Sequence, residues 1–514
     1  MNDHSPQRTS GRYRKLRQPV TDQQKAIKVA TGATAVLAFL LPTSAAQAAA
    51  ASGPQPASNP LSGVTKTVSG EVNGVAGAAQ SAGNSAAAST TAGTVTGTAS
   101  NAQHAAAGEI SAAGLGRAES GVARGVSDPL SPVANGNILP APAGNAFYTP
   151  PNPLPPGKPG DIIWYRKVTP AASRLPASTV YQVLYRSVDA RGNAIAVSGD
   201  VFVPHAKWTG NGARPVVAYA SGTQGWGPQC APSKEIAAGD FDEQFAVSGL
   251  LAKGFAVAVT DEPGEGINGA TQMYTVGRAE GHAVLDSLRA ALNLPGTGLA
   301  KDAPAGVEGY SQGGGAAGWA AQLHHGYAPG LNLKGVALGG TPANLQAVAS
   351  NINGTAFFGF LGGAAIGFGA AYPSLNLQGY LNDAGKKAFR DLQTMCQAQG
   401  LATFALQRIE NYTKDGKNPM NNAAWSRVLD ANDLGTMAPD VPVMQVHGLN
   451  DEVIPYRTEA ALHDQWCKMG ATDDLVSFPT EHVTTGIDDQ AAVVPWLTDR
   501  LTGDSPAPST CDEG

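Results

Sequence analysis

The sequence predicts an α/β fold in which helices cover both faces of a mostly parallel β-sheet. The first observation is a pair of runs rich in β-branched and aromatic residues, 180–187 and 194–203. A turn-like segment joins them, so we expect an antiparallel hairpin. The second observation is the alternation of short apolar runs with helix-like segments over the rest of the chain. This alternation is typical of a parallel sheet that is buried on both faces.

The other expected elements follow in chain order. Short apolar runs predict strands at 215–220, 255–260, 305–308, 333–338, 441–447 and 475–478. Helix-like segments lie between them at 243–253, 281–292 and 313–321. Prolines at 140–159 mark the entry to the globular part, which we expect to start near Phe147.

Length and charge bound the possible functions. The chain has 514 residues, enough for one large domain with additional segments. It carries 34 Lys and Arg against 40 Asp and Glu, a formal net charge of -6. Because there is no basic surplus, we do not expect a nucleic acid as a partner.

The first 140 residues predict export followed by a spacer. Residues 1–48 combine a basic start, an apolar stretch at 29–41 and a small-residue cleavage site at Ala46-Gln47-Ala48, which is typical of a signal peptide. The apolar stretch is short for a membrane span, although an uncleaved anchor is the alternative. Residues 49–140 contain no aromatic residue and are rich in Ala, Gly, Ser and Thr. We expect a disordered spacer here and a secreted protein, with a cell-wall spacer or propeptide as alternatives.

A Gly-x-Ser-x-Gly motif at 309–313 lies between an expected strand and an expected helix. The pattern alone is weak, because a chain with 63 glycines produces chance matches. Its context is more specific, since a serine on a sharp strand-to-helix turn has its hydroxyl exposed. This is the nucleophile elbow of the α/β-hydrolase fold, with Ser311 as the nucleophile.

Two further residues complete a predicted catalytic triad. In parallel sheets, chemistry takes place beyond the carboxyl ends of the strands. Asp451 and His482 each follow such a strand end, and the order Ser311, Asp451, His482 is that of the α/β-hydrolases. A serine needs a base to take its proton, and the base needs an acid to orient it.

Other residues compete for these roles. His447 is a rival base, but it ends a strand and precedes the acid, so we expect a structural histidine beneath the acid loop. Glu452, Asp488 and Asp489 are alternative acids. The remaining histidines of the globular helices are expected to be surface or hydrogen-bonded residues: His282, His324, His325 and His463.

A glycine-rich loop at 221–230 follows the strand expected at 215–220. In this position it can offer a backbone N–H to an oxyanion, and we choose that of Thr223. The second donor should be the N–H of Gln312, directly after the nucleophile. The alternative is a turn with no catalytic part.

The chain resembles the secretory triacylglycerol lipase family, of the fungal lipase A type and its actinobacterial relatives. The resemblance rests on segments from about 161 to 503: SGTQGWGPQCAPS, GHAVLDSLRAA, GYSQGGGAAGWAAQLHHGYAPGL, KGVALGGTPANL, HGLNDEVIP and WLTDRLTG. It implies the same triad. The loop 261–266, DEPGEG, departs from the aspartate, aromatic and glycine found in many relatives, which alters the expected cleft wall.

An insertion at 340–440 divides the predicted hydrolase core into 141–339 and 441–503, and a tail at 504–514 follows. Its run 355–372 has no charged residue and is long enough for a membrane span. The glycines and the position within the domain favour a helical cap instead, with an ordinary core helix as a further alternative. The resemblance implies that the cap contains a tunnel for an acyl chain.

Four cysteines lie in the globular part, and export favours two disulfides, for which three pairings are open. The resemblance implies Cys230–Cys396, between the oxyanion loop and the cap, which leaves Cys467–Cys511 to clamp the tail. The cysteine spacing matches no zinc pattern, so we expect neither a metal nor a cofactor.

Together, these features predict a secreted serine hydrolase that cleaves acyl esters of triacylglycerols through an acyl-enzyme, at a lipid–water interface. The alternatives are a carboxylesterase on short-chain or envelope-lipid esters, an acyltransferase with the same triad, and a non-catalytic surface protein. The sequence leaves the oligomeric state open.

Overall fold

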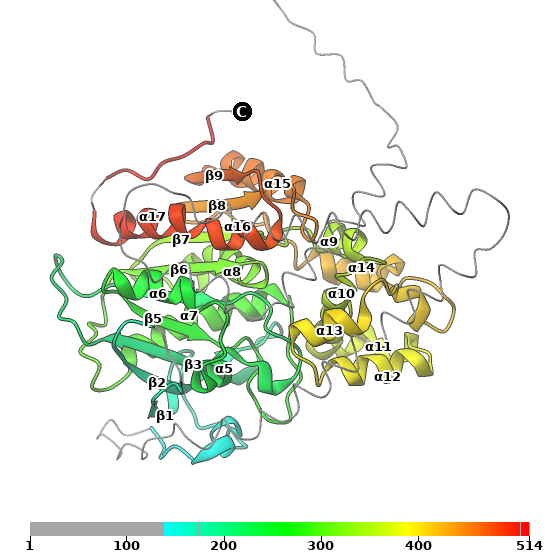
Figure 1. Ribbon diagram of the computed structural model, residues 1–514, viewed down its shortest axis with the longest axis horizontal. Helices are drawn as coiled ribbons and strands as arrows, with labels where there is room; N and C mark the ends of the chain where they lie inside the picture. Colours follow the sequence, from blue (N-terminus) through cyan, green and yellow to red (C-terminus); the bar gives the residue numbers. More distant parts are fainter. Residues whose placement is uncertain (1–137, 172–174, 504, 513–514) are drawn as a thin grey trace, which may run out of the picture.

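The computed structural model describes residues 138–171, 175–503 and 505–512 (Figure 1). The predicted signal peptide and almost all of the predicted spacer lie outside the described residues. One sheet of nine strands has the order β1-β2-β3-β5-β4-β6-β7-β8-β9. The strands are β1 Ile162–Val168, β2 Ser178–Val188, β3 Ala194–Pro204, β4 Val216–Ala220, β5 Ala256–Thr260, β6 Ala305–Tyr310, β7 Leu333–Gly339, β8 Val443–Gly448 and β9 Asp473–Phe478.

The expected hairpin is formed by β2 and β3, which pair antiparallel from Ser178↔Pro204 to Val188↔Ala194. From β5 onward, neighbouring strands pair parallel. Strands β4 and β5 are buried along their whole length, because every residue in VVAYA and AVAVT faces a helix layer on one side or the other.

Two helical layers sandwich the sheet and confirm the predicted α/β fold. Helices α7 Gly277–Asn293, α8 Gln312–Tyr327 and α15 Tyr456–Lys468 share one apolar core with the side chains of alternate strand residues. Helices α5 Pro232–Ala238, α6 Gln244–Ala252 and α17 Gln490–Thr502 pack on the opposite face. Alternate residues of β4 divide between these cores, Val216 and Ala218 in the first and Val217 and Tyr219 in the second.

The residues between β7 and β8 form a separate helical body at one end of the sheet, drawn in yellow in Figure 1. We call it the cap. It contains α9 Leu345–Ile352, α10 Phe358–Ala371, α11 Leu377–Tyr380, α12 Asp383–Leu392, α13 Gln397–Phe404 and α14 Ala423–Asp430. Its buried side chains form an apolar core around α10, which residues outside the cap such as Trp226, Tyr274 and Val453 complete.

Helix α10 contains most of the uncharged run that has the length of a membrane span. Among the described residues, no single helix is long and apolar enough to cross a membrane. The pair formed by α10 and residues 373–380 reaches that length, but with a bend of 112°. Phe358, Leu361 and Phe368 are buried inside the cap, so α10 is the central helix of that body.

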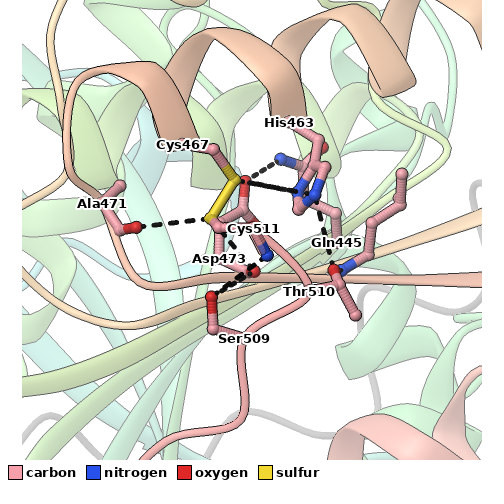
Figure 2. The surroundings of a disulfide bond; sticks show 9 residues. Gln445, His463, Cys467, Ala471, Asp473, Ser509, Thr510 and Cys511 are labelled. Atoms are coloured by element: carbon pink, nitrogen blue, oxygen red, sulfur yellow. Dashed lines mark hydrogen bonds and ion pairs between the residues drawn. A yellow bond between two sulfur atoms is a disulfide. The ribbon is translucent and has the colours of Figure 1, made fainter. Parts of the chain in front are cut away.

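Two disulfides join distant parts of the chain with the pairing that was expected. Cys230–Cys396 connects the loop after β4 to the start of α13 in the cap. Cys467–Cys511 connects α15 to the C-terminal tail (Figure 2). The tail also lies against β9, where the N–H of Thr510 donates to the carbonyl of Asp473 at 3.0 Å.

Candidate active site

Ser311 occupies the turn between β6 and α8, and its backbone has φ 58 and ψ -119. A positive φ is strained for a residue with a Cβ atom, and such strain is typical of a nucleophile elbow. The neighbouring glycines allow the tight turn. A Cβ at Gly309 would lie 2.2 Å from the carbonyl of Gly313, and one at Gly313 would lie 1.9 Å from that of Ala220. The elbow therefore requires glycine at both positions.

The loops after β8 and β9 bring Asp451 and His482 to this serine. His482 Nε2 lies 2.9 Å from Ser311 Oγ, and His482 Nδ1 lies 2.6 Å from Asp451 Oδ2. His482 is the first residue of α16 His482–Asp488, whose N-cap Glu481 accepts bonds from the N–H groups of Val483 and Thr484. The structure thus unites all three predicted residues, in the arrangement needed to deprotonate a serine.

The acid of this trio is held from both sides. Asp451 Oδ1 accepts bonds from the N–H of Val453 at 2.9 Å and of Ile454 at 2.7 Å. Burial raises the pKa of Asp451, but its contacts with His482 and His447 outweigh burial and hold the pKa well below its usual range. Asp451 is therefore ionised at neutral pH.

His482 is 4% exposed, and burial alone would lower its pKa. The charge of Asp451 and its hydrogen bond outweigh this, so the pKa of His482 lies above the ordinary value. A base of this kind holds a proton readily after taking it from serine.

The rival residues have other partners. His447 lies between Glu459 and the acid loop, where its Nε2 is 2.9 Å from the carbonyl of Ile454. Glu452 accepts a bond from the backbone N–H of His482 at 3.3 Å. Asp489 accepts a bond from the side-chain amide of Gln490 at 3.1 Å. The remaining histidines are hydrogen-bonded or paired elsewhere: His282 to Val188, His324 and His325 to Asp440, and His463 to Asp473.

The predicted oxyanion donors lie on adjacent loops. Ala220 at the end of β4 pairs with Gly309 near the end of β6, so Thr223 and Gln312 leave the sheet at the same edge. Neither backbone N–H donates to another group in the described part of the chain. The Thr223 hydroxyl is 2.7 Å from that of Tyr274, and the Gln312 amide donates to Glu280 at 2.9 Å. Both residues are thus fixed by side-chain contacts that leave their N–H groups free.

The loop with Thr223 is attached to the cap. The N–H of Trp226 donates to the carbonyl of Met395 at 2.9 Å, and the N–H of Gln397 donates to that of Gln224 at 2.8 Å. The disulfide Cys230–Cys396 closes the same contact. Any displacement of the cap at this point therefore pulls on the loop.

An apolar cavity extends from Ser311 into the cap. The space within it, open mouth included, is about 870 Å³. Ser311 and Gln312 are among its few polar lining residues, and its apolar lining includes Leu345, Ile352, Phe360, Phe368, Trp425 and Ile454. A lining of this polarity suits an apolar ligand.

One group of possible metal ligands occurs in the described residues, His463 with Cys467 and Cys511. The two sulfur atoms are bonded to each other, so they cannot act as thiolate ligands while the disulfide is closed. Figure 2 shows this group beside the C-terminal tail.

Sequence reasoning did not identify Glu459, Thr341 and Tyr310 as supports of the site. Glu459 accepts bonds from the N–H and hydroxyl of Thr341 and contacts His447. The Tyr310 hydroxyl donates to the carbonyl of His482 at 2.7 Å. Tyr310 stands inside the serine motif, but only the folded chain brings it to His482.

Comparison with known proteins gives consistent results. A family model described as Secretory lipase matches residues 239–509. The secreted triacylglycerol lipase LIP3 of Malassezia globosa is 32% identical over 407 residues, which cover 75% of this chain and 86% of that protein. Lipase 4 of Candida albicans is 30% identical, with coverage of 73% and 85%.

Solved structures show the same fold. Candida antarctica lipase A in its closed state has a TM-score of 0.62 at 24% identity and covers 71% of this chain and 88% of its own. The rice cell wall degrading esterase LipA of Xanthomonas oryzae has a TM-score of 0.55 at 18% identity, with coverage of 67% and 99%.

Proposed function

Because this chain belongs to the secretory lipase family, and is therefore a secreted carboxylic ester hydrolase, we propose that it hydrolyses acylglycerols through a covalent acyl-enzyme on Ser311. The observation that carries the proposal is the hydrogen-bonded series Ser311, His482 and Asp451 at the mouth of an apolar cavity. The names of the relatives, secreted triacylglycerol lipases, support the substrate class.

The reaction proceeds in two halves. Ser311 Oγ attacks the ester carbonyl carbon while His482 Nε2 takes its proton, and Asp451 stabilises the resulting imidazolium. The N–H groups of Gln312 and Thr223 donate to the oxyanion, each contributing roughly 3 kcal/mol. His482 then gives the proton to the leaving glycerol oxygen. Water then enters, loses a proton to His482 and attacks the acyl-enzyme carbonyl. His482 returns that proton to Ser311 Oγ as the fatty acid leaves, which restores the free enzyme.

The cavity accounts for the acyl half of the substrate. An acyl chain that leaves water for the apolar cavity gains about 0.8 kcal/mol for each buried methylene group. The cap covers the cavity with Phe360, Phe368 and Trp425 and keeps bulk water from the chain. We therefore expect activity to rise with chain length until the cavity is filled.

The test is hydrolysis of p-nitrophenyl esters from acetyl to palmitoyl by the purified protein, beside Ser311→Ala and the matched control Ser350→Ala in the cap. Activity that rises toward long chains and is lost in Ser311→Ala alone is the expected result. Activity confined to short chains would replace the lipase with a carboxylesterase. Transfer of the acyl group to an added alcohol in preference to water would indicate an acyltransferase, and full activity of Ser311→Ala would refute the nucleophile.

A further inference from the structure

His447, the next-to-last residue of strand β8 before the acid loop, is completely buried and meets an acceptor at both ring nitrogens. Nδ1 contacts the carboxylate of Glu459. Nε2 lies 2.9 Å from the carbonyl of Ile454 and 3.3 Å from Asp451 Oδ2. A neutral imidazole has one N–H, so beside an ionised Glu459 it would leave one nitrogen lone pair facing an oxygen lone pair.

The partners determine where the protons reside. The carbonyl of Ile454 has no proton to give, so Nε2 must be the donor on that side. Burial raises the pKa of Glu459. The N–H of Thr341 at 2.7 Å and its hydroxyl at 3.0 Å donate to this carboxylate, and these bonds favour its ionised form beside His447. The proton between Glu459 and His447 therefore belongs on Nδ1. Both ring nitrogens carry protons, and His447 is a cation between two carboxylates.

We propose that His447 is a protonated positioning residue that keeps Asp451 ionised and oriented toward His482, with Glu459 and Thr341 holding His447 in its charged form. The inference rests on the proposed triad and extends it by two further groups. The full series is Ser311, His482, Asp451, His447 and Glu459, with a proton donor or acceptor at every contact.

The first consequence is geometric. Asp451 Oδ2 receives His482 at 2.6 Å and His447 at 3.3 Å, while Oδ1 receives two backbone N–H groups. With both oxygens held, the carboxylate cannot rotate away from His482. Loss of the His447 contact would leave one side of the carboxylate free to move. Because a displacement of about 1 Å at a catalytic group can lower the rate about 100-fold, we expect kcat to fall by about 10-fold to 100-fold.

The second consequence is electrostatic. The charged groups and rings around His447 are Glu459 and the edge-on ring of Tyr456 from α15, Asp451 from the acid loop and His482 from α16. The positive charge of His447 lowers the pKa of His482, against the larger raising effect of Asp451. Removal of that charge should raise the pKa of His482, and the acid limb of the kcat/KM profile should move to higher pH by roughly one unit.

His324 provides a matched control, because it lies at the opposite ends of the strands from the triad. His324 is also buried, with Nδ1 2.7 Å from a carboxylate oxygen of Asp440 and Nε2 3.2 Å from the carbonyl of Leu331. Asp440 and Leu331 precede β8 and β7, whereas the triad follows the strand ends. His324→Gln therefore removes a similar pair of contacts without touching the catalytic residues.

The experiment compares kcat and KM between pH 5 and 10 for the wild type, His447→Gln and His324→Gln, with thermal unfolding of each. We expect the reduced kcat and the displaced acid limb in His447→Gln only. A His447→Gln enzyme that folds and keeps the wild-type limb and kcat would overturn the proposal.

A direct measurement covers the case in which His447→Gln does not fold. In wild-type protein labelled with ¹⁵N-histidine, both nitrogens of His447 should show protonated shifts at pH 8, where a free histidine is neutral. One unprotonated nitrogen at that pH would contradict the proposal. If Ser311→Ala retained full esterase activity, the proposed function would fail instead, and the charge of His447 would still be measured.

Discussion

At the scale of single residues, the hydrogen bonds of Asp451 predict the effect of its amide analogue. In Asp451→Asn, the N–H groups of Val453 and Ile454 require the side-chain carbonyl at the Oδ1 position. The new NH₂ then faces His482 Nδ1 and stabilises the tautomer protonated on Nε2, which cannot accept the Ser311 proton. We expect kcat to fall by about 10⁴-fold at pH 8.

The neighbouring acid provides the control for this measurement. Glu452→Gln removes a charge near His482 but leaves the Asp451 contacts in place. A loss in Glu452→Gln as large as that in Asp451→Asn would show that the acid was assigned to the wrong residue.

The sequence could predict Ser311, Asp451 and His482 because each follows the end of a strand, which is a local feature of the chain. The supports of these residues are not local. Glu459 lies on helix α15, whose sequence pattern is that of an ordinary amphipathic helix. Thr341 reaches it only because β7 pairs with β8 in the folded chain. His447 was expected to be structural, which describes its burial but not its two carboxylate contacts.

At the scale of elements, the contact between α10 and the loop after β4 depends on a glycine. A Cβ at Gly363 would lie 1.8 Å from Trp226 Nε1. Gly363→Ala should therefore displace Trp226, disturb the loop that contains Thr223, and destabilise the protein by about 1–3 kcal/mol. We expect a lower kcat together with a lower free energy of unfolding, measured by esterase assay and urea denaturation.

Gly326 in α8 is the matched control, because no atom lies within 4 Å of a Cβ built there. Gly326→Ala should stabilise the helix by up to about 1 kcal/mol and leave kcat unchanged. Equal behaviour of the two variants would argue against the coupling of the cap to the oxyanion loop.

The disulfide Cys467–Cys511, which attaches the C-terminal tail, is expected to contribute to stability rather than to catalysis. Cys467 and Cys511 are 44 residues apart, and closing a loop of that length stabilises the folded state by roughly 4 kcal/mol in the chain-entropy model. This disulfide holds the tail against Asp473 at the start of β9 (Figure 2). His482 lies beyond the other end of that strand. The double variant Cys467→Ser with Cys511→Ser should unfold at lower urea concentration with an unchanged kcat at 25 °C. A large loss of kcat under conditions where the variant is folded would show that this disulfide also supports catalysis.

At the scale of the whole molecule, alternation of strands and helices predicted the sheet, but it did not predict β1. That strand contains Arg166 and Lys167, which obscure an apolar pattern. In the structure Arg166 is buried and donates to Gln182 on β2 and to the carbonyl of Gly144. A buried arginine of this kind depends on partners that no local pattern reveals.

Two buried acids with no cationic partner among the residues that the structure describes predict how global stability changes with pH. Burial raises the pKa of Glu280 to about 8 and that of Glu308 to about 7. Side-chain hydrogen bonds from Gln312 and Gln490 offset this only in part. Both carboxyl groups bind protons more tightly in the folded chain than in the unfolded chain, where their pKa is near 4.3. Their contribution to stability is therefore complete below that value and is lost as the pH rises through 7 and 8.

As the pH rises from the unfolded-state pKa to the folded-state pKa of each group, the free energy of unfolding should fall by up to about 1.4 kcal/mol per pH unit. Asp451 acts in the opposite direction, because its lowered pKa makes its contribution present at neutral pH and lost only in acid. Urea denaturation between pH 5 and 8 should thus show stability falling as the pH rises. Glu308→Gln removes one of the two groups and should reduce the slope between pH 5 and 7. Stability that rises over this range, or a slope unchanged in Glu308→Gln, would show that these carboxyl groups gain compensating partners on ionisation.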